Sequence, residues 1–207
     1  SYRAALRLEP NHGDAHNNLA AVLRDLGRPE EALASYRNLL ALGVDFPEAH
    51  NNIGLVLSEL GQFEEALTSF QRAIAGRPDY PEAHNNMALA LQDLGRMADA
   101  MASCARAIAA DPTYAKAHYN LGNALRAAGR LEAAADSYGR ALAANPNYAL
   151  AHNNLGLAQQ EMGQIEAAMD SFRQAIAQNG DYAVARANLG ALSDDAGNIE
   201  EMERLIG

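Results

Sequence analysis

The chain has 207 residues, 49% of them hydrophobic, and a formal net charge of −10. A nucleic-acid partner needs clustered lysines and arginines, and the sequence has only 16 scattered cationic residues, so we expect no nucleic-acid binding. No apolar run approaches the ~18 residues that a membrane helix requires, so we expect no membrane association. The single cysteine, Cys104, excludes an internal disulfide and fits a reducing compartment, the cytoplasm.

One six-residue stretch returns along the chain at a constant step of 34 residues. It reads Ala-His-Asn-Asn-Ile-Gly in the second copy. The sixth copy, Ala-Arg-Ala-Asn-Leu-Gly, has drifted at two places, where Arg and Ala replace the His and the first Asn. A strict period in this range is typical of a stacked array, whose units pack on their neighbours rather than around one central core. The copies begin at Ala15, Ala49, Ala83, Ala117, Ala151 and Ala185.

Each copy predicts two helices. In the second copy, apolar residues at helical spacing predict a first helix at about 47–60 and a second at about 63–76. Gly61 ends the first helix, because glycine adopts a left-handed conformation at little cost. Pro78 prevents the second helix from continuing, and Asp79 is predicted to cap the next helix. The turn glycine recurs as Gly27, Gly61, Gly95, Gly129, Gly163 and Gly197.

The register of the repeat divides the chain into three parts. Residues 1–12 read as the C-terminal half of an upstream repeat helix, residues 13–180 as five complete 34-residue hairpins, and residues 181–207 as a sixth repeat truncated in its second helix. This is the pattern of a fragment. Both ends carry apolar side chains without a capping helix, so we expect head-to-tail self-association of copies through the uncapped ends.

Small and large side chains alternate at fixed repeat positions and predict how each hairpin closes. Small residues let the two helices approach, while aromatic residues fill the space beside them. Cys104 stands at an aromatic position and is predicted to be a small buried hydrophobic residue. The small site of the first helix is Ala20, Gly54, Ala88, Gly122, Gly156 and Gly190. That of the second is Ala32, Ala66, Ala100, Ala134 and Ala168, and the aromatic slot is Tyr36, Phe70, Cys104, Tyr138 and Phe172.

This pattern resembles the tetratricopeptide repeat (TPR) family, whose signature has an aromatic residue, a Leu-Gly pair and a Tyr, followed by Ala, Phe and Pro. His replaces the first aromatic residue in five copies, and Val44 and Gly180 replace the closing proline. The resemblance implies an all-α protein, an α-solenoid of stacked antiparallel helix hairpins forming a superhelix. The repeats are most similar to the TPR arm of the O-linked N-acetylglucosamine transferases, in which a row of asparagines lines the inner groove.

Asparagine is the main candidate for function. The second Asn of each copy lies about 200° around the helix from the His, and therefore points away from the hairpin seam. A side-chain amide offers one acceptor and two donors, which match a peptide backbone. Alternatively, each Asn bonds to a neighbouring helix and fixes the angle between repeats, and both interpretations can hold together. The candidate peptide-binding residues are Asn18, Asn52, Asn86, Asn120, Asn154 and Asn188, with Asn17, Asn51, Asn85, Asn153, Lys116 and Arg126.

Five repeated histidines raise the hypothesis of a metal site. Zinc requires ligand nitrogens about 2.0–2.1 Å from one ion, and successive helices lie roughly 8–10 Å apart, so equivalent residues cannot converge. We predict core histidines with one hydrogen-bonded nitrogen, and expect neither a metal nor a cofactor. The residues are His16, His50, His84, His118 and His152.

Charge and the lack of a catalytic motif complete the prediction. Acidic residues near the ends of the first helices indicate either a solvated face or an acidic groove with a local basic step at Lys116 and Arg126. The sequence has no phosphate-binding loop and no HExxH motif, so we expect no enzyme activity in this chain. We predict a scaffold that binds an extended peptide through an asparagine ladder. The alternatives are the substrate-recruiting arm of a glycosyltransferase and a module that assembles head to tail.

Overall fold

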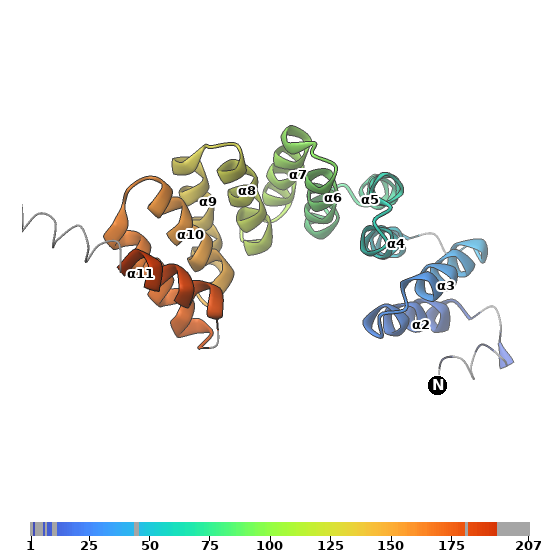
Figure 1. Cartoon of the computed structure of the whole chain (residues 1–207). Helices are drawn as coiled ribbons and strands as arrows, with labels where there is room; N and C mark the ends of the chain where they lie inside the picture. Colours follow the sequence, from blue (N-terminus) through green and yellow to red (C-terminus); the bar gives the residue numbers. More distant parts are fainter. Residues whose placement is uncertain are drawn as a thin grey trace, which may run out of the picture. The chain divides into compact units, whose positions relative to one another are not determined.

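The computed structural model describes residues 12–43, 46–180 and 182–193, together with Tyr2, Leu6, Leu8 and Glu9. All regular secondary structure among these residues is helical, which confirms the predicted all-α class. Residues 183–193 form a further helical segment. The labelled helices in Figure 1 are α2 (Gly13–Asp25), α3 (Pro29–Ala41), α4 (Pro47–Glu59), α5 (Phe63–Gly76), α6 (Pro81–Asp93), α7 (Met97–Ala110), α8 (Ala115–Ala127), α9 (Leu131–Ala144), α10 (Ala149–Glu161) and α11 (Ile165–Gln178).

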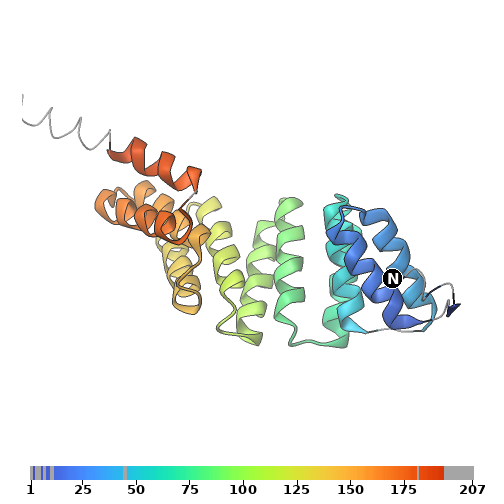
Figure 2. The same cartoon turned by 90° about the horizontal axis from the view of Figure 1, so that it is seen from below.

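The chain divides into two compact units, Ser1–Pro112 and Thr113–Gly207. In unit 1, the hairpins α2–α3, α4–α5 and α6–α7 are stacked, because the second helix of each hairpin packs on the first helix of the next. Unit 2 repeats this arrangement with α8–α9 and α10–α11. The paired helices run side by side in both views (Figures 1 and 2). Each unit is therefore an α-solenoid of antiparallel hairpins, as predicted.

A glycine ends the first helix of every hairpin. Gly61 has φ +72°, and its N–H donates to Ser58 O at 3.0 Å, while Gln62 N–H donates to Leu57 O at 2.8 Å. These two bonds form a Schellman motif, which satisfies carbonyls that the helix end leaves without partners. The predicted turn glycines Gly27, Gly61, Gly95, Gly129 and Gly163 all have positive φ, and Gly197 lies outside the described residues.

The predicted cap at Asp79 is wrong. The N-cap of α6 is Tyr80, which has φ −103° and ψ 89° and makes no capping bond with its side chain. Pro81 disfavours helical geometry at Tyr80. The same repeat position is the N-cap at Phe46, and also at Tyr114 and Tyr148, which precede alanines, so the position in the repeat sets the cap with or without a proline.

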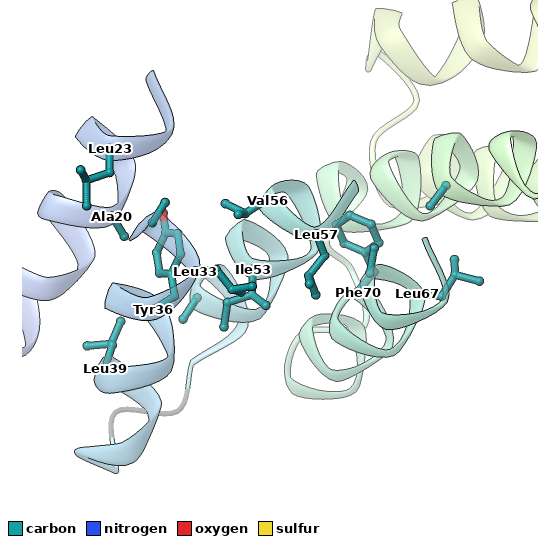
Figure 3. Packing of buried hydrophobic residues seen from close by; sticks show 14 of the residues in the cluster. Ala20, Leu23, Leu33, Tyr36, Leu39, Ile53, Val56, Leu57, Leu67 and Phe70 are labelled. Atoms are coloured by element: carbon teal, nitrogen blue, oxygen red, sulfur yellow. The ribbon is translucent and has the colours of Figure 1, made fainter. Parts of the chain in front are cut away.

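The hairpins close as the pattern of side-chain sizes predicted. All five residues of the aromatic slot, Cys104 included, are completely buried, and so are the five alanines opposite them. A Cβ added to Gly54 would lie 2.5 Å from Cε1 of Phe70, so only a hydrogen fits at that point. Figure 3 shows labelled side chains of α2, α3, α4 and α5 filling one continuous cluster in unit 1.

The predictions about the two ends of the chain fall largely on residues that the structure does not describe. Residues 183–193 supply the first helix of the sixth copy. Its truncated second helix, most of the upstream half-helix and the proposed head-to-tail contact lie outside the described residues.

Candidate functional site

The asparagines lie on one side of the first helices, which we name the A face. Each unit has its own A face: that of unit 1 is formed by α2, α4 and α6, and that of unit 2 by α8, α10 and residues 183–193. The first Asn is nearly inaccessible in three copies, with exposed fractions of 5% at Asn51, 3% at Asn85 and 2% at Asn153. The second Asn is half-exposed in four copies, Asn52, Asn86, Asn154 and Asn188. Asn17 is half-buried, Asn18 is exposed and Asn120 is buried.

The two rows of asparagines are connected across successive repeats. Asn86 Nδ2 of α6 donates to Asn51 Oδ1 of α4 at 3.0 Å. Asn188 Nδ2 donates to Asn153 Oδ1 of α10, also at 3.0 Å. Each bond therefore joins the second Asn of one copy to the first Asn of the preceding copy. An amide has two N–H donors and one acceptor, so one such bond leaves Asn86 and Asn188 with unused hydrogen-bonding capacity.

The other two half-exposed asparagines face tyrosine hydroxyls. Asn52 bonds to the hydroxyl of Tyr36 in the preceding repeat. Asn154 Nδ2 donates to Asn123 Oδ1 at 2.8 Å and to the Tyr119 hydroxyl at 3.2 Å. Asn123 Oδ1 also accepts from the hydroxyl of Tyr138 at 2.8 Å.

The choice of partner follows the slot residue. Where the preceding slot holds Phe70 or Phe172, the second Asn bonds to the first Asn of that copy. Where it holds a tyrosine, the amide faces a hydroxyl: that of the slot residue Tyr36 for Asn52 and, for Asn154, that of Tyr119, which replaces the first Asn of its copy. One consequence is visible at Asn17, whose buried Oδ1 has no hydrogen-bond partner, since Asn52 is bonded to Tyr36.

Two of the repeated histidines have the predicted hydrogen-bonded nitrogen. His84 Nε2 donates to the carbonyl oxygen of Pro78 at 2.9 Å, and His152 Nε2 donates to that of Pro146 at 3.0 Å. In the sixth copy Arg186 replaces the histidine, and its Nη2 donates to the carbonyl of Gly180, which replaces the proline. The side chain therefore ties the first helix to the loop before it. Among the described residues, no group of three or more His, Cys, Asp or Glu is placed to hold a metal ion.

Charged residues on the A face are partly paired. Glu48 accepts from Arg77 at 2.7 Å, and the guanidinium of Arg77 lies 3.5 Å from the ring centroid of Tyr80. Arg126 Nε donates to Glu161 Oε1 at 2.8 Å, so this predicted contact residue already has a partner. Lys116 is exposed and makes no ion pair with a described residue. Exposed pairs of this kind contribute about 0–1 kcal/mol, so they add little to the stability of the fold.

Unit 2 carries a tyrosine cluster that the sequence analysis missed. The Tyr119 ring lies 4.9 Å from that of Tyr148 and 6.0 Å from that of Tyr138, between centroids. Burial, with Tyr119 nearby, raises the pKa of Tyr148 to about 12. A signal was available, because an aromatic residue precedes the first helix in five copies at the repeat step: Phe46, Tyr80, Tyr114, Tyr148 and Tyr182.

Stacked helix hairpins with a strict period define the class of α-solenoid repeat proteins. Family models described as tetratricopeptide repeat match residues 11–79, 51–115, 103–135 and 149–182, and one described as TPR repeat matches residues 122–163. Together they cover residues 11–182 without a gap. The chain therefore carries tetratricopeptide repeats, the family that its sequence resembles. No protein of curated function shows a significant match in sequence.

Solved structures of TPR proteins share the fold. YrrB, described as a TPR protein with an unusual peptide-binding site, is 21% identical with a TM-score of 0.66, over 91% of this chain and 97% of its own. MamA from Desulfovibrio magneticus RS-1 is 23% identical with a TM-score of 0.70, over 83% and 97% of the two chains. A chain of the anaphase-promoting-complex tetramer Cut9–Hcn1 is 19% identical with a TM-score of 0.80, over 92% of this chain and 38% of its own. Identities this low support the fold alone.

None of the helices among the described residues has the length and apolarity to span a membrane.

Proposed function

We propose that the chain is a protein-interaction scaffold in which the A face of each unit binds an extended peptide segment. The observation that carries this proposal is the state of the second asparagine in four copies. Asn52, Asn86, Asn154 and Asn188 are half-exposed, and each is held by a hydrogen bond to a neighbouring side chain. A side chain that is already oriented loses less conformational entropy on binding.

The chemistry of these amides favours a peptide backbone as the ligand. Each keeps donor or acceptor groups that match the carbonyl and N–H of a main chain. First helices that pack together are roughly 8–10 Å apart, and an extended chain rises ~3.3 Å per residue, so about every third residue would meet an amide. Main-chain recognition would tolerate many ligand side chains, while the buried Asn51, Asn85 and Asn153 would act by orienting their partners.

The proposed contacts are individually weak. A neutral hydrogen bond contributes about 0.5–1.5 kcal/mol net, so affinity requires several amides together. A single Asn→Ala change would therefore weaken binding only mildly. Asn18, Asn120, Lys116 and Arg126 remain predicted contacts. The peptide-binding site named in the description of YrrB belongs to that protein, and its fold is consistent with such a role here.

A peptide array tests the proposal. The wild-type chain is compared with a variant in which Asn52, Asn86, Asn154 and Asn188 are all changed to Ala. A control variant changes four exposed polar residues of the second helices, Asn38, Gln71, Gln174 and Gln178, to Ala. Both are used only at temperatures where circular dichroism shows native helix content. We expect the first variant to lose signal across peptides of unrelated side chains, and the control to keep it. Equal signals from all three proteins would refute the proposal.

The asparagine rows also favour a more specific role. Similarity to the TPR arm of the O-linked N-acetylglucosamine transferases would make this face a substrate-recruiting surface for a glycosyltransferase. This second proposal requires a nucleotide-sugar domain in the same protein. Sequencing the gene beyond the codon for Gly207 tests it, and a reading frame without such a domain would reject it.

A further inference from the structure

The A faces of the two units differ in charge. The helices α4 and α6 of unit 1 carry four carboxylates and no lysine or arginine: Glu48, Glu59, Glu82 and Asp93. The other first helix of unit 1, α2, adds Arg24, which pairs with Glu59 at 3.8 Å, so Glu48, Glu82 and Asp93 still leave this face acidic. The corresponding helices of unit 2, α8 and α10, carry Lys116, Arg126 and only one carboxylate, Glu161. Because Glu161 is hydrogen-bonded to Arg126 at 2.8 Å, the charge of Lys116 is left without a counter-charge.

The repeat explains why Lys116 has no ion-pair partner among the described residues. It stands where the second copy has Glu48, whose carboxylate is held by Arg77. The residue of unit 2 that corresponds to Arg77 is Asn145, which is neutral and uses its side chain to accept from the N–H of Asn147 at 3.2 Å. Lys116 is thus an exposed cation in a chain whose net charge is −10.

Apolar side chains continue the row that Lys116 begins. At the same repeat position, unit 1 has Glu48 and Glu82, whereas the last two copies have Leu150 and Val184. Leu150 is 45% exposed and Val184 is 54% exposed, so both present apolar surface to solvent. Both lie one helical turn before a half-exposed asparagine, Asn154 or Asn188, and therefore on the A face.

We propose that the A face of unit 2 docks an extended protein segment that combines apolar side chains with a carboxylate. Lys116 pairs with the carboxylate, and Leu150 and Val184 contact the apolar side chains, beside the half-exposed amides. The inference rests on the proposed peptide-binding function and adds the chemistry of the partner. Charge complementarity selects this occupant. The net negative chain repels an acidic segment at long range, but salt screens charges beyond about 8–10 Å, so within that distance the attraction of Lys116 for a carboxylate decides.

Fluorescence anisotropy of three short labelled peptides tests this with the full chain. In these probes leucine alternates with glutamate, with glutamine or with lysine. We expect the glutamate peptide to bind about tenfold more tightly than the lysine peptide, and Lys116→Glu to reverse the order. Arg106→Glu, on the exposed side of α7 in unit 1, changes net charge equally and should keep the wild-type order. Leu150→Ser should weaken the glutamate and glutamine peptides alike.

Each of the following outcomes would reject the inference. Equal binding of all three peptides, unchanged by Lys116→Glu, would refute the proposed partner chemistry while peptide binding itself stands. Binding of none would also refute it, and the array would then decide the proposed function separately. If analytical ultracentrifugation shows a dimer that Lys116→Glu dissociates, the occupant is a second copy of the chain.

Discussion

Asn86 in α6 donates a hydrogen bond of 3.0 Å to the buried Oδ1 of Asn51 in α4, and so links two consecutive repeats. Asn86→Ala would leave that oxygen without its partner in a site where Asn51 is only 5% exposed. Leaving a buried polar group unsatisfied costs about 1–3 kcal/mol, so we expect a loss of stability in this range. Urea denaturation followed by circular dichroism measures it.

The double variant Asn51→Ala and Asn86→Ala provides the internal control for this link. Since both partners are removed, we expect it to lose less than the sum of the single changes. Asn38→Ala on the exposed side of α3 should change stability by less than about 0.5 kcal/mol. Additive losses from the two single variants would mean that the bond does not couple the helices.

Tyr36→Phe tests whether the slot residue directs the amide. The change removes the hydroxyl that Asn52 faces, and leaves the amide free to bond to Oδ1 of Asn17, which has no partner. We therefore expect a change of less than about 0.5 kcal/mol, because one hydrogen bond replaces another. Tyr138→Phe should cost about 1 kcal/mol, since its bond to Asn123 has no such replacement. Equal losses in the two variants would contradict the slot rule.

Gly54→Ala tests the closeness of the two helices in a hairpin. The new Cβ would lie 2.5 Å from Cε1 of Phe70, and overpacking a core costs about 1–3 kcal/mol. Gly139→Ala is a matched control within α9, because nothing lies within 4 Å of its added Cβ. That control should stabilise by about 0.5–1 kcal/mol through helix propensity alone. If both variants behave alike in urea denaturation, the approach of the helices at Gly54 is looser than described.

The sequence predicted the backbone and the core well because both depend on residue size at a fixed step. A small residue faces an aromatic residue in the pairs Gly54–Phe70 and Gly122–Tyr138. Such a pair fits only where the two helices pack closely. The turn at Gly61 was equally readable, since a glycine recurs where the helical pattern stops. The misplaced cap at Asp79 followed from weighing one side chain alone, whereas the aromatic residue before the first helix is the N-cap in four copies, at Phe46, Tyr80, Tyr114 and Tyr148.

The partners of the asparagines could not be predicted from the repeat alone. Asn52 and Asn86 occupy the same position, yet one faces the Tyr36 hydroxyl and the other bonds to Asn51. That choice depends on a residue about half a repeat away, whose hydroxyl matters only after the hairpins have stacked. The pairing of Arg126 with Glu161 likewise required the spacing between helices.

The buried tyrosines predict a loss of stability in alkali. Burial raises the pKa of Tyr138 and Tyr148 to about 12, from an ordinary value of 10.0. Between these values the unfolded chain has lost protons that the folded chain keeps, so stability falls as pH rises from about 10 to about 12. Below about pH 10 their contribution is complete. Urea midpoints across this range should fall less steeply in the variant with both Tyr138→Phe and Tyr148→Phe, and equal slopes would contradict the assignment.

Cys104 predicts a thiol that reacts only after unfolding. It is completely buried, and that burial raises the pKa of the thiol to about 12, so almost no thiolate is available at neutral pH. We expect no reaction with a thiol reagent such as Ellman's reagent in the native chain, and one equivalent in denaturant. In a Cys104→Ala background, Ala105→Cys places a thiol on the exposed side of α7 and should react at once. Because Cys104 fills an aromatic slot, its labelling rate would report how often this hairpin opens. Prompt labelling of the native wild-type chain would show that the slot is accessible and that the third hairpin is not closed as described.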